Sequence, residues 1–121
     1  MDGVNASLDL VKEEILRELR EDFVGLWEFV GRIRAHWPSA NAAQVRTLVI
    51  RCVRELLAEE AIQPGFPTPD GRGFQPWAIS PDETVAAIEL VWDRIGREPT
   101  IGEIVWFDRA SRTVPPARKS D

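Results

Sequence analysis

Residues 41–60 read NAAQVRTLVIRCVRELLAEE. Apolar side chains recur through this stretch at spacings of three and four residues, which is the spacing of one face of an α-helix. At about 100° per residue they cover an arc of roughly 140° to 180°. Asn41 can cap the start of the helix, with Gln44 as its reciprocal partner, or Ser39 can cap it alone. We therefore predict a helix from residue 41 to about residue 60 that packs against other elements on more than one side.

Three further stretches have helical character. A first helix is predicted over residues 7–20, with one apolar stripe made of Leu8, Val11, Ile15 and Leu19. A second is predicted over residues 23–37, where a following proline disfavours further helix. Another starts at Ser80, which can cap it together with Glu83, and stops at Gly96.

Residues 61–80 have a different composition, rich in proline, glycine and aromatic residues. Two short apolar pieces flank a strong turn signal at residues 69–71, which predicts a small two-stranded hairpin or an extended loop. Residues 104–107 fit either a helical turn or a strand. The expected fold is mainly α (α+β): one helical domain over residues 1–108 with a small β-hairpin, followed by a disordered basic tail over residues 109–121.

The charge is unevenly distributed along the 121 residues. The chain has 15 Lys and Arg against 20 Asp and Glu, a net charge of −5 that argues against bulk attraction to nucleic acid or anionic membrane. Residues 29–54, however, contain no acidic residue and five arginines, so 10 basic and 20 acidic residues (−10) remain elsewhere. These five are Arg32, Arg34, Arg46, Arg51 and Arg54.

Motifs for catalysis, cofactors and metals are missing from the sequence. It has one histidine, one cysteine, no nucleophile elbow and no phosphate-binding or dinucleotide-binding glycine pattern. A Cys52–His36 pair would need an exposed thiolate, whereas Cys52 falls on the apolar arc of the helix over 41–60. We expect a protein that is not an enzyme and binds no cofactor. The absence of a long apolar run or a signal segment makes the cytoplasm the default compartment.

One polar face of the same helix suggests nucleic-acid binding. Gln44, Thr47, Arg51 and Arg54 project within an arc of about 80°, opposite the apolar side. Glutamine and arginine are side chains that contact base edges, and threonine and arginine bind phosphates. The alternative interpretation is a solvated helix face whose arginines pair with acidic neighbours.

The order of these parts resembles a winged helix-turn-helix domain over roughly residues 22–95. A helix ends at Trp37-Pro38, a short turn and a longer helix follow, and residues 62–77 correspond to a wing with its tip at residues 70–73. The resemblance implies DNA contacts through the four polar residues of the helix, with Arg72 reaching the minor groove or a phosphate. Winged helices also include many that bind proteins instead of DNA.

Aromatic residues form a second candidate surface. They lie in or near the loop-rich sequence: Phe66, Phe74, Trp77, Trp106 and Phe107. Packed together they would be a satellite core; exposed, they would be a patch for a protein partner or a platform for single-stranded bases. We expect a non-catalytic binding or regulatory module for a protein partner, of adaptor, immunity or regulator type. The alternative is a DNA-binding regulator that forms a homodimer through the apolar stripe of residues 7–20.

Overall fold

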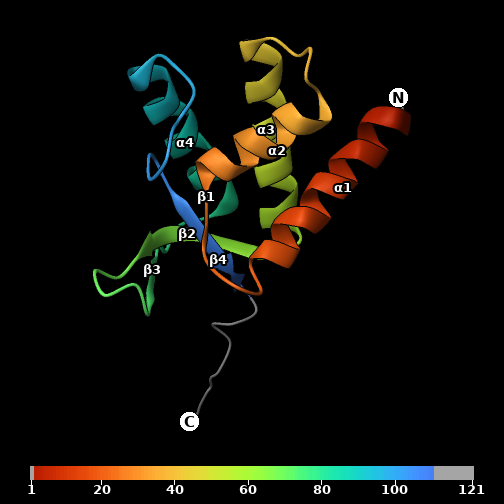
Figure 1. The fold of residues 1–121 in the computed structure, drawn as a ribbon. Helices are drawn as coiled ribbons and strands as arrows, with labels where there is room; N and C mark the ends of the chain where they lie inside the picture. The colour runs from red at the N-terminus through yellow and green to blue at the C-terminus, as the bar shows by residue number, and fades with distance from the viewer. Residues whose placement is uncertain (1, 111–121) are drawn as a thin grey trace.

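The computed structural model describes residues 2–110 and has the mainly α, α+β architecture that the sequence predicts. In chain order its elements are α1 (Asp2–Glu18), β1 (Val24–Gly25), α2 (Leu26–His36), α3 (Ala42–Ala58), β2 (Ile62–Pro67), β3 (Phe74–Pro76), α4 (Pro81–Ile95) and β4 (Trp106–Arg109). The helices gather at one end of the molecule and the strands at the other, as Figure 1 shows.

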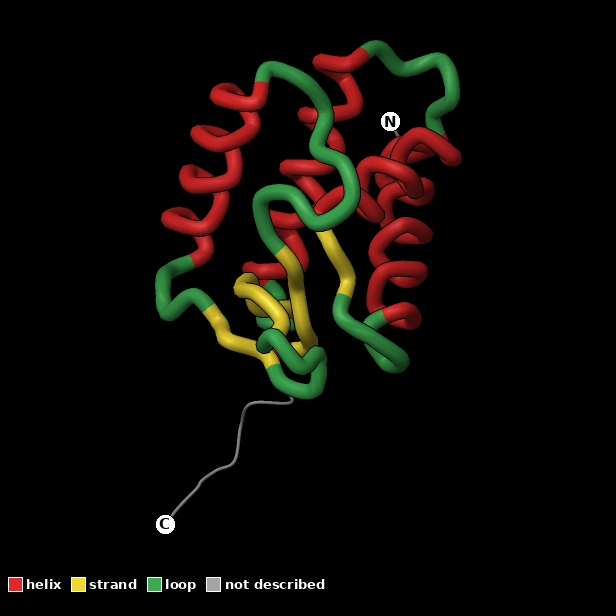
Figure 2. The backbone as a smooth tube through the Cα atoms, turned by 60° about the vertical axis from the view of Figure 1, so that its left-hand side comes forward, coloured by secondary structure: helices red, strands yellow, loops and turns green. Residues whose placement is uncertain are grey.

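The strands, yellow in Figure 2, lie together at one end of the molecule. They form one antiparallel sheet in the order β1-β4-β2-β3. The predicted hairpin is present as β2 and β3, but it is half of this larger sheet. Residues 104–107 fit either a helical turn or a strand from their sequence, and the last two of them, Trp106 and Phe107, begin strand β4. Because β4 pairs with both β1 and β2, it joins the start of the fold to its end.

Three boundaries differ from the sequence prediction. Helix α1 begins at Asp2, five residues earlier than expected. Helix α2 begins at Leu26 because the two residues before it pair with β4, and the Leu26 N–H donates to the Val105 carbonyl at 3.0 Å. Arg109 pairs with Ile62 in the sheet, so the tail boundary at residue 109 was placed too early. The remainder of the predicted tail, residues 111–121, lies outside the described residues.

The predicted helix caps are confirmed. Asn41 Oδ1 accepts the Gln44 N–H at 2.8 Å, and Gln44 Oε1 accepts the Asn41 N–H at 2.9 Å. Ser80 and Glu83 make the same reciprocal pair at the start of α4. These caps satisfy backbone donors that have no partner inside the helix, and they fix where each chain segment enters its helix.

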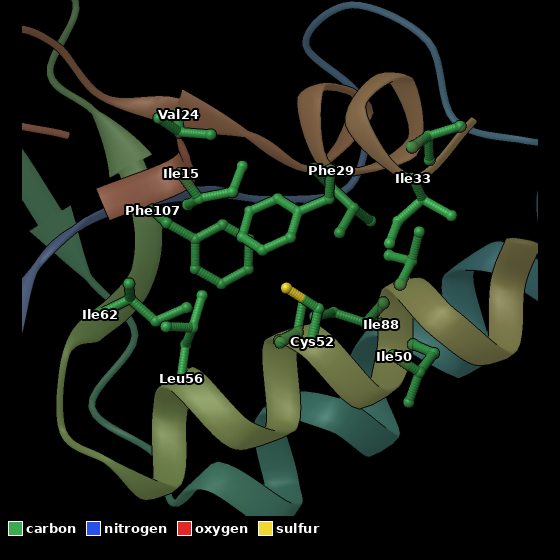
Figure 3. Close-up of a cluster of buried hydrophobic side chains, with 14 of the residues drawn as sticks. Ile15, Val24, Phe29, Ile33, Ile50, Cys52, Leu56, Ile62, Ile88 and Phe107 are labelled. Atoms are coloured by element: carbon green, nitrogen blue, oxygen red, sulfur yellow. The ribbon is translucent and has the colours of Figure 1, made fainter. Parts of the chain in front are cut away.

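Helix α3 lies at the centre of the core, as its wide apolar arc predicts. It packs against α1, α2, α4 and β2. Figure 3 shows Cys52 pointing from α3 into a cluster with Phe29 and Phe107, whose ring centroids are 5.2 Å apart. This central packing leaves one strip of α3, between α1 and α4, open to solvent.

The apolar stripe of the first helix is part of this core. Leu8, Val11, Ile15 and Leu19 are each at most 1% exposed within a single chain. The stripe is therefore not available as the dimer contact that the sequence suggested. A dimer through this helix would have to use its outer face, which carries the half-exposed Leu10.

Candidate interaction surfaces

The open strip of α3 carries the four polar residues that the helical spacing predicts. Gln44, Thr47, Arg51 and Arg54 are all exposed. Each arginine nevertheless has a partner within the chain. Arg51 Nε donates to Glu55 Oε2 at 2.9 Å and its terminal nitrogen donates to Asn5 Oδ1 of α1 at 2.5 Å. Arg54 Nη1 lies 3.6 Å from Asp82 Oδ1 of α4.

The other three arginines of the acid-free stretch are paired as well. Acidic residues that are distant in sequence supply the carboxylates, and they come from α1, from α4 and from the loop after α4. The pairs are Arg32 with Glu14 and Glu18, Arg34 with Glu98, and Arg46 with Asp93. The positive stretch of the sequence is thus divided among several faces of the fold and is balanced on each of them.

An ion-pair network joins α1 to α3 beside the exposed strip. Lys12 Nζ donates to Glu59 at 2.6 Å and to Glu55 at 3.2 Å, and the Lys12 side chain is only 13% exposed. Burial by itself lowers the pKa of Lys12, but the hydrogen bonds to Glu59 and Glu55 outweigh it, and the pKa is raised. The network fixes α1 along one edge of α3.

A cavity of about 820 Å³ opens at the turn between α2 and α3. Its walls include Val4, His36, Trp37, Gln44, Thr47 and Leu48. His36 Nε2 lies 3.0 Å from Glu14 Oε2. Burial raises the pKa of Glu14, but the hydrogen bonds from His36 and Arg32 lower it more, so the net pKa is below the usual value. Because Gln44 and Thr47 line this cavity, they lie in a hollow of the surface.

Arg72 lies at the tip of the hairpin, which extends away from the helices (Figure 1). The tip is tightly hydrogen-bonded: the Thr68 hydroxyl donates to Asp70 Oδ1 at 2.6 Å, and the Arg72 backbone N–H donates to the same oxygen at 3.0 Å. These bonds lower the pKa of the Asp70 carboxyl. The side chain of Arg72 is exposed and belongs to a different element from the four polar residues of α3.

The five aromatic candidates are divided between core and surface. Phe107 is fully buried, so its assignment to a partner surface is wrong. Trp106 is half-buried edge-to-face against Trp27, with centroids 4.7 Å apart. Phe74 is half-buried and packs against Phe23, with ring centroids 5.1 Å apart. Neither a single satellite core nor a single patch describes this set.

The remaining two aromatic residues, Phe66 and Trp77, pack against each other at the surface. Phe66 is 43% exposed and its ring packs edge-on against the half-buried Trp77, at 5.7 Å between centroids. Ile79, which the sequence analysis did not single out, is 42% exposed. We call Phe66, Trp77 and Ile79 the hairpin patch.

A groove of about 510 Å³ opens beside the hairpin patch, and we call it the hairpin groove. Its apolar wall includes Leu57, Ile62, Pro64, Trp77, Ile79 and Pro81. These residues come from the end of α3, from β2, from the segment between β3 and α4 and from the first position of α4, so their sequence positions alone do not place them together. Trp77 and Ile79 belong both to the patch and to the groove, which makes the two one continuous surface.

Glu60 also lines the hairpin groove, and the sequence analysis did not identify it. Its backbone has φ = +58°, the left-handed region that usually holds glycine where a helix ends. The sequence feature that could have drawn attention to Glu60 is the absence of a glycine directly after the helix. Among the described residues, the Glu60 carboxylate has neither an ion pair nor a hydrogen bond, whereas Glu55 and Glu59 are bound to Lys12.

Cys52 behaves as a core residue. Burial raises the pKa of its thiol to about 12, so the sulfur stays protonated at neutral pH. Within residues 2–110 there is no group of three or more His, Cys, Asp or Glu side chains placed to hold a metal ion. In the same range, none of the helices has the length and apolar character needed to cross a membrane.

Comparisons with known protein families, curated proteins and solved structures give no match to this chain. The case for a function therefore rests on the surfaces described above.

Proposed function

We propose that this protein is a non-catalytic binding module that engages a protein partner through the hairpin patch, as an adaptor, immunity or regulatory protein does. One observation carries the proposal: Phe66 and Ile79 remain exposed, beside the half-buried Trp77 and a groove with an apolar wall. Aromatic side chains next to a pocket are the usual centres of protein interfaces. A chain with one cysteine can form no internal disulfide, and we propose the cytoplasm as its compartment.

The chemistry of this surface favours a protein over a nucleic acid. Stacking on single-stranded bases needs cations between the rings to hold the phosphates. No Lys or Arg is found among the described residues that line the groove, and Glu60 carries a negative charge there. An apolar side chain of a protein partner would fill the groove without that repulsion.

Co-purification with paired variants tests the proposal. We expect partner proteins to be retained by the wild-type chain and to be lost with Phe66→Ala and with Trp77→Ala. Leu90→Ala is the matched control, because Leu90 is an exposed apolar residue on α4, 53% accessible and outside the groove. Circular dichroism checks that each variant is folded. Equal recovery of the same proteins by all four chains would contradict the proposal.

A DNA-binding winged-helix regulator is the second candidate. It is supported by the joint exposure of Gln44, Thr47, Arg51 and Arg54 on one strip of α3. The order helix, strand, helix, helix, hairpin is also compatible with the resemblance. Arg72 would then contact a phosphate from the hairpin tip.

Duplex binding at low salt tests this second candidate. If it is correct, mixed-sequence duplex DNA raises the anisotropy of the labelled protein, and the affinity falls steeply as salt rises. The Arg51→Glu/Arg54→Glu double variant should then abolish binding. No binding of the wild-type chain at low salt would eliminate this candidate.

A further inference from the structure

We propose that the hairpin groove receives a basic peptide segment of the partner, with an apolar side chain in the groove and a neighbouring lysine or arginine paired with Glu60. This inference rests on the proposed function and adds the chemistry of the partner to it. Three observations carry it: the composition of the groove wall, the unpaired carboxylate of Glu60 and the backbone conformation of that residue.

The composition of the groove wall indicates that a ligand should bring an apolar side chain and a cation. Apart from Gln63 and Glu60, the side chains of the described residues lining the groove are all apolar, which calls for an apolar anchor. Glu60 is the one charged residue among them. A ligand seated in the groove thus meets negative charge at its rim, and charge complementarity favours a cation there.

Glu60 differs from its acidic neighbours in having no cation of its own. Glu55 and Glu59 share the ammonium group of Lys12, and Asp82 lies near Arg54. Among the described residues no basic side chain pairs with Glu60. A carboxylate beside an apolar wall is partly dehydrated when a ligand covers that wall, so a cation supplied by the ligand would compensate it.

The backbone of Glu60 argues that its side chain has a use. At φ = +58° a residue with a Cβ atom is strained, and glycine would fit this position better. Backbone strain of this kind clusters at active sites and ligand clamps, and a helix that ends in this conformation usually has glycine there. Glycine here would improve the end of α3 but would remove the carboxylate from the groove.

Peptide selection tests the inference without knowledge of the partner. A phage library of random dodecapeptides is selected on the immobilised full-length chain. We expect the enriched peptides to combine a bulky apolar residue with Lys or Arg within a few positions of it. Labelled synthetic copies should then bind in fluorescence anisotropy, with an affinity that falls as salt rises.

Substitutions at Glu60 give the decisive readings. Glu60→Gln should weaken the selected peptides about three- to tenfold, and Glu60→Lys should weaken them more. Glu13→Gln, which removes an exposed acid on α1, is the matched control and should leave the affinity unchanged. Glu60→Gly should raise the urea midpoint of unfolding while weakening the peptide, a combination that a purely structural role of Glu60 would not produce.

Two outcomes would overturn the inference: a selection that yields no peptide or only peptides without basic residues, or binding that is unchanged by Glu60→Gln. If non-basic peptides bind and lose affinity with Trp77→Ala, the hairpin patch remains a protein-binding surface and only the basic character of its ligand is rejected. The proposed function itself fails separately, through co-purification that does not depend on Phe66 or Trp77.

Discussion

The polar strip of α3 and the hairpin patch differ in how far other residues of the chain provide contacts for their side chains. Both stood out in the sequence as binding surfaces, one through arginines and one through aromatic rings. In the folded chain Arg51 and Arg54 have internal partners on α1, α3 and α4. Phe66 and Ile79 keep more than two fifths of their surface exposed. Exposed apolar area has no internal compensation, so it is the stronger indication of a missing partner.

The comparison also shows why charge is hard to judge from a local stretch of sequence. Ion pairs form between residues far apart in the chain, as in the pair of Arg34 with Glu98. Such pairs cancel the field that would attract a polyanion, even though each surface pair contributes little to stability. A run without acids therefore indicates a basic surface only when the fold does not bring acids to it.

The largest effect that we predict separates buried from exposed aromatic residues. Phe107→Ala should lower the free energy of unfolding by about 3–5 kcal/mol, because it leaves a cavity against Phe29. Phe66→Ala should cost about 1 kcal/mol or less, because much of its ring already faces solvent. Urea denaturation followed by tryptophan fluorescence measures both. Equal losses would mean that the aromatic residues form one core after all.

The second prediction concerns the ion-pair network beside the α3 strip. Lys12→Ala should destabilise the fold by about 1–3 kcal/mol, because Glu55 and Glu59 lose their shared donor in a partly buried position. Lys12→Met keeps the apolar stem and should cost less. Arg17→Ala, an exposed change on the same helix, is the control and should stay within about 0.5 kcal/mol of wild type. A loss with Arg17→Ala equal to that with Lys12→Ala would show that the network is not responsible.

Local signals made part of this structure predictable. Asn41 with Gln44, and Ser80 with Glu83, lie within one helical turn of each other, and both caps formed as expected. Strand β1 gave no such signal, because two residues cannot show a strand period and Phe23 continues the helical spacing of the next segment. Its pairing with β4 depends on a contact between opposite ends of the fold.

The candidate site was predictable to a similar degree. Phe66 and Trp77 were identified because aromatic residues are conspicuous in a loop-rich sequence. The groove beside them was not, since its walls come from α3, β2, the segment before α4 and the first position of α4. Glu60 was missed because its importance depends on a left-handed backbone and on the absence of a cation nearby, and both are properties of the folded chain.

A third prediction uses pH to separate the two regions. Burial raises the pKa of Glu55, but hydrogen bonds from Arg51 and Lys12 lower it more, and the net pKa lies below the usual value of 4.5. A carboxyl whose pKa is depressed by folding stabilises the fold above its unfolded pKa and loses that contribution as pH falls through the folded pKa. Glu55→Gln should therefore cost about 0.5–1 kcal/mol at pH 7 and progressively less below about pH 4.5.

Urea unfolding of wild type and Glu55→Gln at several pH values provides the measurement. Phe66→Ala is the control from the hairpin patch. Since Phe66 carries no charge, its difference from wild type should not change over the same pH range. A Glu55→Gln difference that stayed constant down to pH 3 would contradict the assignment of the ion pairs.

The smallest expected effect bears most directly on the choice between the two surfaces. The side chains of Arg54 and Asp82 are 52% and 93% exposed, and Arg54 Nη1 lies 3.6 Å from Asp82 Oδ1. Arg54→Ala should therefore change the free energy of unfolding by no more than about 0.5 kcal/mol. Because the fold gains so little from Arg54, any larger effect of its removal must come from a ligand. On the protein-partner proposal, Arg54→Ala should leave co-purification unchanged and should not alter retention on duplex DNA. A loss of duplex binding, with the salt dependence reduced by about one phosphate contact, would instead identify the α3 strip as the functional face.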